Sequence, residues 1–152
     1  MNFEELKKGL KAREGLELKE YICPAGYPTI GYGRNLKSNG ISLKEADYLL
    51  KNDVEMIDNL LWNELFFYKF LIQPRKNALI EIVYNMGFSN FMEFEKTINY
   101  LGLGEWKNAS KELLDSEWHR DFIKYDMLDG KKSKSKLRSE ILSEMIEKGI
   151  YL

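Results

Sequence analysis

The spacing of apolar residues changes once along this chain, and that change limits the fold more than any other feature. In residues 2–14 the apolar side chains are three or four apart, as on one face of a helix, and Gly15 is suited to end it. From Leu16 apolar and polar residues alternate, while glycines recur at 26, 31, 33 and 40. The region predicts a short antiparallel sheet with tight turns.

After Asn39-Gly40 the spacing becomes helical again. Ser42-Leu43-Lys44-Glu45 has the form of a capping box, in which a hydroxyl and a carboxylate satisfy backbone donors at a helix start. We expect this helix to reach about Leu61. Its predicted apolar face comprises Ala46, Leu49, Leu50, Met56, Ile57, Leu60 and Leu61.

The remaining segments also have helical spacing. Helices are predicted from Pro74 to Gly87, over 91–101 and 106–114, around Trp118, and over 135–148, with a break at Asp129-Gly130. A helix, a small sheet and then a helical body predict an α+β fold rather than alternating β/α units.

Length and composition fit one domain over residues 1–152, with a β part at about 15–41 and helical parts at 1–14 and 42–152. The 152 residues are 44% hydrophobic and carry a net charge of −1, which is unlike disordered chains and dedicated nucleic-acid binders. One Cys and one His exclude an intramolecular disulfide and a closed zinc site without several carboxylates. We expect no metal, cofactor or nucleic-acid partner.

Two segments bear on membranes. The N-terminus has acidic residues where a signal peptide has a basic start, so we expect synthesis in a cytoplasm. The most apolar run, residues 65–72, contains Lys69 and is far shorter than the roughly 20 residues that cross a bilayer. We expect this run to pack inside the fold and predict no stable membrane association.

Glu14 continues the apolar face of the first helix, since it follows Leu10 by four residues. Two interpretations stay open. The side chain can reach water beyond the end of that face, the usual behaviour of a Glu and the favoured interpretation of Glu14 alone. It can instead be a partly buried acid whose pKa is raised by burial, as a proton donor requires.

Arg138 flanks the apolar face of the last predicted helix, which includes Ile141 and Met145. If the first and last helices meet, Arg138 would hold and orient Glu14 and oppose the rise in its pKa. The alternative is that Arg138 belongs to a solvated basic run over residues 131–138. A nucleic-acid partner for that run would show steeply salt-dependent binding.

Residues 23–33 combine glycines, tyrosines and a threonine. Glycine lets the backbone approach a ligand closely, and tyrosine offers stacking and hydrogen-bonding surfaces. The stretch resembles one wall of a cleft. It is not a phosphate-binding loop, because no Gly-Lys-Ser/Thr follows.

Two motifs closely resemble the start of phage-type lysozymes, the T-even-like group in glycoside hydrolase family 24. They are Arg13-Glu14-Gly15-Leu16 and Gly26-Tyr27-Pro28-Thr29-Ile30-Gly31-Tyr32-Gly33. In that family a catalytic Glu is followed, with eight residues between, by Asp or Cys and then, with five between, by Thr. The corresponding residues are Glu14, Cys23 and Thr29.

The resemblance continues over nearly the whole chain, through residues 75–78, 84–87, 106, 116–118 and 138–151. It implies a lysozyme-like fold: a small sheet lobe and a larger helical lobe, joined by the helix that starts at Ser42, with the site between them.

The resemblance also implies roles for particular residues. Glu14 would be the general acid, while Cys23 and Thr29 position the water or stabilise the developing sugar cation. An unperturbed thiol has a pKa of about 8.5, so we expect Cys23 to be a poorer general base than Asp, though able to orient water. The alternative for Cys23 is an inert buried thiol. Arg138 matches the family's arginine beside the Glu.

Substrate contacts are expected from both lobes. The candidates are Tyr32, Arg34 and Asn35 on the sheet side, and Tyr84 and Asn85 on the helical side. Arg34 departs from the family, whose members often have His there. His119 is expected to be a surface or packing residue rather than a base.

The function implied is that of an endolysin, a muramidase that hydrolyses the β-1,4 bond between N-acetylmuramic acid and N-acetylglucosamine in bacterial peptidoglycan. We expect a monomer in the host bacterial cytoplasm that reaches the wall after a holin permeabilises the membrane. The alternative is a peptidoglycan-binding or scaffold module with the same fold, whose chemistry is weakened by Cys23.

Overall fold

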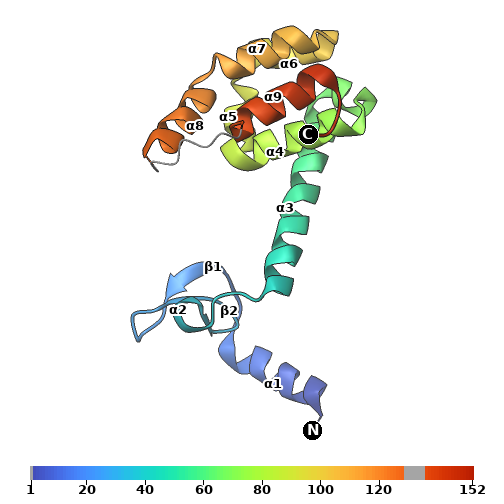
Figure 1. Cartoon of the computed structure of the whole chain (residues 1–152). Coiled ribbons are helices and arrows are strands. Elements are labelled where there is room, and N and C mark those ends of the chain that lie inside the picture. Colours follow the sequence, from blue (N-terminus) through green and yellow to red (C-terminus); the bar gives the residue numbers. More distant parts are fainter. Residues whose placement is uncertain (1, 129–135) are drawn as a thin grey trace. The chain divides into compact units, whose positions relative to one another are not determined.

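The computed structural model describes residues 2–128 and 136–152, so the predicted break at Asp129-Gly130 lies outside the described residues. The chain divides into two compact units, Met1–Leu49 and Leu50–Leu152. The first unit contains all the strands and the second is entirely helical in its described part (Figure 1). The predicted α+β architecture is therefore confirmed.

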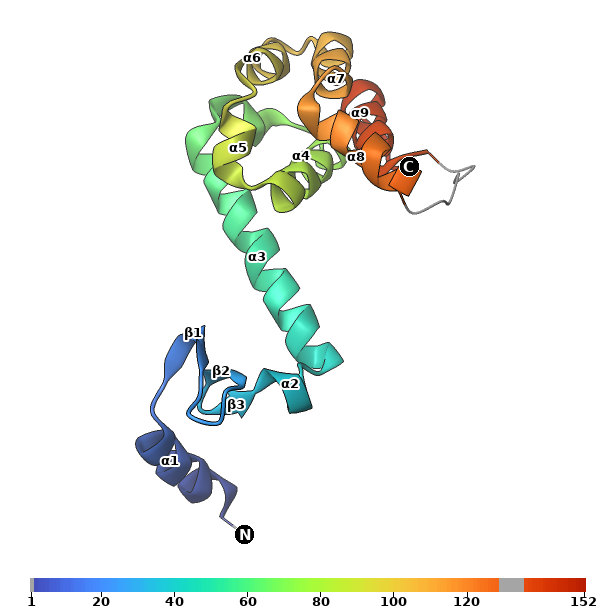
Figure 2. The ribbon, with the colours of Figure 1, turned by 90° about the vertical axis from the view of Figure 1, so that its left-hand side faces the viewer.

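The first unit begins with helix α1 (Phe3–Glu14), which has Asn2 as its N-cap and Gly15 as its C-cap. A three-stranded antiparallel sheet follows, in the order β1 (Glu17–Ile22), β2 (Pro28–Gly31) and β3 (Arg34–Asn35). The short helix α2 (Leu36–Asn39) packs against β2 (Figure 2).

The strand register explains why Thr29 is buried. Thr29 pairs with Tyr21 of β1 on one side and with Asn35 of β3 on the other, so it lies in the centre of the sheet. Its side chain is only 3% exposed. Ile30 pairs with Arg34, which leaves residues 31–33 as a three-residue turn. Gly31 and Gly33 both have positive φ there, a conformation that glycine adopts without strain.

Helix α3 (Leu43–Glu64) starts with the predicted capping box. The Ser42 hydroxyl accepts a hydrogen bond from the Glu45 backbone N–H at 3.3 Å, and the Glu45 carboxylate accepts one from the Ser42 backbone N–H at 2.7 Å. The helix runs three residues beyond the predicted end at Leu61.

The predicted apolar face of α3 is only partly correct. Ile57 and Leu61 are buried, whereas Leu49, Leu50 and Met56 are exposed. The first unit includes α3 as far as Leu49, and the buried residues lie in the last two turns. Helical spacing therefore predicted the element correctly but not how far along it burial extends.

The second unit adds seven further helical elements in its described part. They are η1 (Phe66–Phe70), α4 (Gln73–Met86), α5 (Phe88–Met92), α6 (Glu95–Leu103), α7 (Trp106–Leu114), α8 (Glu117–Leu128) and α9 (Arg138–Lys148). Helix α9 packs against both α4 and α7 (Figure 1). Its buried residues join those of α4 and α7 in one core. The core includes Leu79, Ile82, Val83, Ala109, Leu113, Leu142 and Ile146.

Two predictions for this unit were wrong in part. The helix predicted over residues 91–101 is interrupted at Glu93 and Phe94, although no glycine or proline marks the break. The apolar run at residues 65–72 is not wholly internal: Phe66 and Phe70 are 76% and 74% exposed. Their rings make an edge-to-face contact on the surface.

No helix in the described part of the chain is both long enough and apolar enough to span a bilayer.

Arg75 joins the start of α4 to the end of α9. Its guanidinium lies 3.9 Å from the centre of the Trp106 ring, and its Nε donates to the Ile146 carbonyl oxygen at 2.8 Å. Gly149 follows α9 in a left-handed conformation beside this guanidinium. A Cβ atom at Gly149 would lie 2.8 Å from Ile72 Cδ1 and 3.0 Å from Arg75 Cζ.

We predict that Gly149→Ala destabilises the protein by about 2–4 kcal/mol, because left-handed strain and overpacking add. Urea unfolding measures the change. Gly104→Ala is the matched control: its φ is also positive, but its Cβ would meet Trp106 at an ordinary 3.5 Å. Equal losses in both variants would show that the crowding at Arg75 is unimportant.

Candidate active site

The carboxylate of Glu14 lies over the 31–33 turn of its own unit. A Cβ atom on Gly33 would be 3.1 Å from Glu14 Oε2, so the acid reaches this backbone because residue 33 has no side chain. Two parts of the predicted site, separated by β1 and β2 in the sequence, are thus brought together. Glu14 itself is exposed, as in the first of the two interpretations, and the first unit alone does not provide the burial that the second interpretation requires.

Cys23, in the loop between β1 and β2, and Thr29, in β2, both contact the backbone of Tyr27. The Cys23 backbone N–H donates to the Tyr27 carbonyl at 3.0 Å, and the Thr29 hydroxyl donates to the same oxygen at 3.0 Å. Cys23 is half-buried. Hydrogen bonds to the backbone of Tyr27 and then to the Thr29 side chain lower the pKa of the Cys23 thiol. The thiol is therefore more acidic than the unperturbed value expected from the sequence.

The other candidates of the first unit have varied environments. Tyr32 is exposed, with Lys11 Nζ 5.4 Å from the centre of its ring. Asn35 caps α2, where its Oδ1 accepts from the Ser38 backbone N–H at 3.1 Å. Arg34 is half-buried and makes an ion pair with Glu45 at 2.6 Å.

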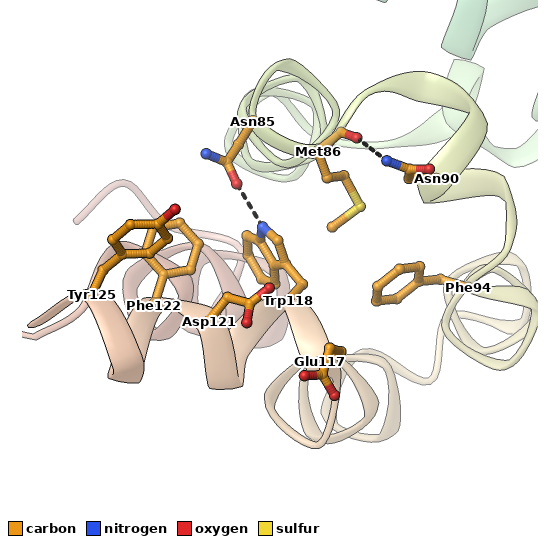
Figure 3. Close-up of a pocket in the computed structure, with 9 residues that line it drawn as sticks. All are labelled: Asn85, Met86, Asn90, Phe94, Glu117, Trp118, Asp121, Phe122 and Tyr125. Carbon is orange, nitrogen blue, oxygen red and sulfur yellow. Dashed lines mark hydrogen bonds between the residues drawn. The ribbon is translucent and has the colours of Figure 1, made fainter. Parts of the chain in front are cut away.

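The second unit has an open pocket of about 600 Å³ between α4, α5 and α8 (Figure 3). Its largest aromatic residue, Trp118, is buried and makes an edge-to-face contact with Phe122. The indole Nε1–H donates to Asn85 Oδ1 at 2.7 Å. This bond uses the acceptor of the Asn85 amide and leaves its Nδ2–H groups for a ligand.

Glu117 and Asp121 also line this pocket, but both are paired along α8. Glu117 contacts Arg120 at 3.2 Å and Lys124 at 3.1 Å, and these bonds lower the pKa of its carboxyl. Asp121 contacts Lys124 at 2.9 Å. The acids therefore add little uncompensated charge to a mainly aromatic and amide surface.

The remaining candidates also belong to the second unit. Tyr84 is exposed beside Asn85. Arg138 is exposed at the first position of α9 and lines a separate recess of about 400 Å³ with Glu81 and Tyr151. His119 is half-buried, and its Nδ1 lies 2.8 Å from Ser139 Oγ, as expected of a packing residue.

Sequence reasoning missed two residues that the structure connects to the site. Gly33 was noted only as part of a glycine motif, yet it is the residue that Glu14 approaches. Trp118 was noted only as part of the resemblance, yet it orients Asn85 across 33 positions of sequence. Neither contact has a local sequence signal, because both depend on distant segments meeting.

In the described part of the chain, no group of three or more His, Cys, Asp or Glu residues is arranged to hold a metal ion.

We predict that Cys23 is alkylated by iodoacetamide with a pH midpoint below that of N-acetylcysteine measured in the same assay, because its hydrogen bonds stabilise the thiolate. Thr29→Val should raise the midpoint by removing one of these bonds. Ser38→Ala, a change to an exposed hydroxyl elsewhere in this unit, should leave it unchanged. A wild-type midpoint at or above that of N-acetylcysteine would contradict the lowered pKa.

Comparisons with known proteins identify the family of this chain. A model of the phage lysozyme family matches residues 11–136. An endolysin of Acyrthosiphon pisum secondary endosymbiont phage 1 is 32% identical over 114 residues, covering 71% of this chain and 76% of the relative. Probable T4-type lysozyme 2 of Dictyostelium discoideum is 28% identical over 143 residues, covering 75% and 84%. The chain therefore belongs to the phage lysozyme family and is a glycoside hydrolase.

Proposed function

We propose that this protein is a muramidase that hydrolyses the β-1,4 bond between N-acetylmuramic acid and N-acetylglucosamine in bacterial peptidoglycan. The observation that carries the proposal is the placement of the Glu14 carboxylate over Gly33. It brings an acid to the turn at the end of the strand that contains Thr29. Family membership supports peptidoglycan as the substrate.

Glu14 would act as the general acid. Cleavage of a glycosidic bond requires a proton on the leaving oxygen as the bond breaks, and a carboxyl group is the usual donor. Gly33 leaves space beside the carboxylate, so a sugar oxygen can approach it without meeting a side chain.

Cys23 and Thr29 would position the attacking water. The Thr29 hydroxyl has a single proton, which it donates to the Tyr27 carbonyl when Cys23 is a thiol and to the sulfur when Cys23 is a thiolate. In both states the oxygen lone pairs can accept a hydrogen from water. The lowered pKa of Cys23 increases the thiolate fraction, and a thiolate can accept a second hydrogen or remove a proton. This makes Cys23 a better substitute for a carboxylate than an unperturbed thiol.

Other side chains would bind the glycan or its acetamido groups. Tyr32 and Asn35 of the first unit, and Tyr84 and Asn85 of the second, are the candidates. Asn85 is the best supported, because Trp118 holds its amide with the donor side available. The predicted support of Glu14 by Arg138 concerns residues of different units and stays a prediction of the sequence.

The biological setting is a separate proposal. Synthesis in a bacterial cytoplasm and release through a holin-permeabilised membrane would suit a phage endolysin, as one relative is named. Other relatives come from Dictyostelium discoideum, so the family is not confined to phages.

We predict that Glu14→Gln lowers the lysis of outer-membrane-permeabilised bacteria by about 100-fold or more, because the amide cannot donate the proton that a general acid supplies. Turbidity measures the lysis, and mass spectrometry of the released muropeptides should find reducing-end muramic acid. Glu17→Gln, a nearby exposed change, is the control. Equal activity of wild type and Glu14→Gln would favour the binding-module alternative.

For Cys23 we expect the aspartate and alanine variants to behave differently. Cys23→Asp should retain lysis, because a carboxylate can accept hydrogen from water. Cys23→Ala should reduce lysis by about tenfold or more, because no acceptor remains at that position. The same turbidity assay decides, and an alanine variant as active as wild type would make the thiol a spectator.

A further inference from the structure

The guanidinium of Arg34 is engaged by two contacts inside the first unit. Its Nε donates to the Gly40 carbonyl at 2.7 Å, and its Nη1 donates to Glu45 Oε1 at 2.6 Å. The donors of a guanidinium are rigid and coplanar, so two partners in different directions fix its orientation. These contacts give Arg34 a structural role within the first unit, while its predicted contact with substrate stays a prediction.

Glu45 extends these contacts to the start of α3. Its second oxygen, Oε2, accepts from both the backbone N–H and the hydroxyl of Ser42, each at 2.7 Å. The Ser42 backbone bond, followed by the Ser42 hydroxyl and Arg34, lowers the pKa of the Glu45 carboxyl. The carboxylate therefore keeps its charge in mildly acidic solution. We name this set of residues, Arg34, Gly40, Ser42 and Glu45, the Arg34 clamp.

The backbone of Arg34 also ends the turn on which Glu14 lies. Arg34 pairs with Ile30 across β2 and β3, so the clamp is attached to one end of the 31–33 turn. Gly33 directly precedes Arg34, and its Cβ position is 3.1 Å from Glu14 Oε2. A displacement of Arg34 would move the part of the backbone that contacts the acid.

We propose that Arg34 is a positioning residue for the catalytic acid: with Glu45 it holds the 31–33 turn where the Glu14 carboxyl lies against Gly33. The inference rests on the proposed function of Glu14. Arg34 acts through the backbone of the turn and contacts neither the sugar nor the attacking water. Misplacing a reacting group by about 1 Å can cost roughly 100-fold in rate, so a small relaxation of this turn would be measurable.

A positioning role for Arg34 predicts effects on KM, kcat and melting temperature that differ from those of two simpler roles. A substrate-binding Arg34 would affect KM and leave kcat unchanged. A purely stabilising Arg34 would lower the melting temperature and leave both kinetic constants unchanged in the folded protein. A positioning Arg34 lowers kcat with little effect on KM.

The test compares the full-length wild type with Arg34→Ala, Arg34→Lys and Glu45→Gln on soluble peptidoglycan fragments, below the melting temperature of every variant. We expect kcat to fall about tenfold in Arg34→Ala and Glu45→Gln, with KM within about twofold. Arg34→Lys should be intermediate, because an ammonium can replace only one of the two directed contacts. The double variant Arg34→Ala/Glu45→Gln should be no worse than either single variant, since both break one unit.

Lys51→Ala is the matched control. Lys51 also makes an ion pair on α3, with Glu55 at 3.6 Å, but it is not part of the clamp. We expect its kinetic constants to equal those of wild type.

Hydrogen exchange provides a readout that does not require activity. Amides of residues 31–33 should exchange faster in Arg34→Ala and Glu45→Gln than in wild type or Lys51→Ala. Unchanged exchange in both clamp variants would overturn the proposal, as would a change in KM alone or in melting temperature alone. An inactive wild type would instead overturn the proposed hydrolysis, and the exchange comparison would still decide whether Arg34 holds the turn.

Discussion

The contact between the Glu14 carboxylate and the backbone of Gly33 is the constraint on which the rest of the candidate site depends. It requires a residue without a side chain in a left-handed turn, and it requires α1 to end beside the sheet. Both conditions are met in the first unit, where Gly15 ends the helix and residues 31–33 turn the chain from β2 to β3. Among the described residues of that unit, Glu14 lies against the Gly33 backbone and makes no ion pair.

The polar side chains of the first unit make different kinds of contact. Thr29 is buried in the sheet, and its hydroxyl can donate its one proton to the Tyr27 carbonyl or to the Cys23 thiolate while its oxygen acts as an acceptor. Cys23 gains acidity from hydrogen bonds in the same loop rather than from a neighbouring cation. Arg34 and Glu45 bind each other at the start of α3. The proposed chemistry and its structural support therefore involve different residues of the first unit.

The second unit is stabilised in a different way. Its stability depends on apolar burial between helices, with α9 packed against α4 and α7 and Arg75 joining the ends of two of them. In the pocket of this unit, the Trp118 indole fixes the orientation of the Asn85 amide through a hydrogen bond. This oriented amide is the group of the second unit that we propose to bind the acetamido groups of the glycan.

The sequence by itself determined the succession of helix, sheet and helices, the capping box at Ser42 and the motif that identifies the family. These features depend on local spacing, turn residues and caps, which act over a few positions. Residue types with several possible partners were harder to interpret. Arg34 was expected to contact substrate from the sheet side of the site, and its pairing with Glu45 needed the fold.

Only the tertiary structure decided which faces are buried and which distant groups meet. The exposed side chains of Leu50 and Phe66 show that apolar spacing alone does not predict burial. The break at Glu93 shows that it does not predict where a helix is interrupted either. The lowered pKa of Cys23 likewise depends on where a loop places its hydrogen-bond donors. Burial and hydrogen bonding are properties of neighbours in space, and the packing of segments far apart in the chain selects those neighbours.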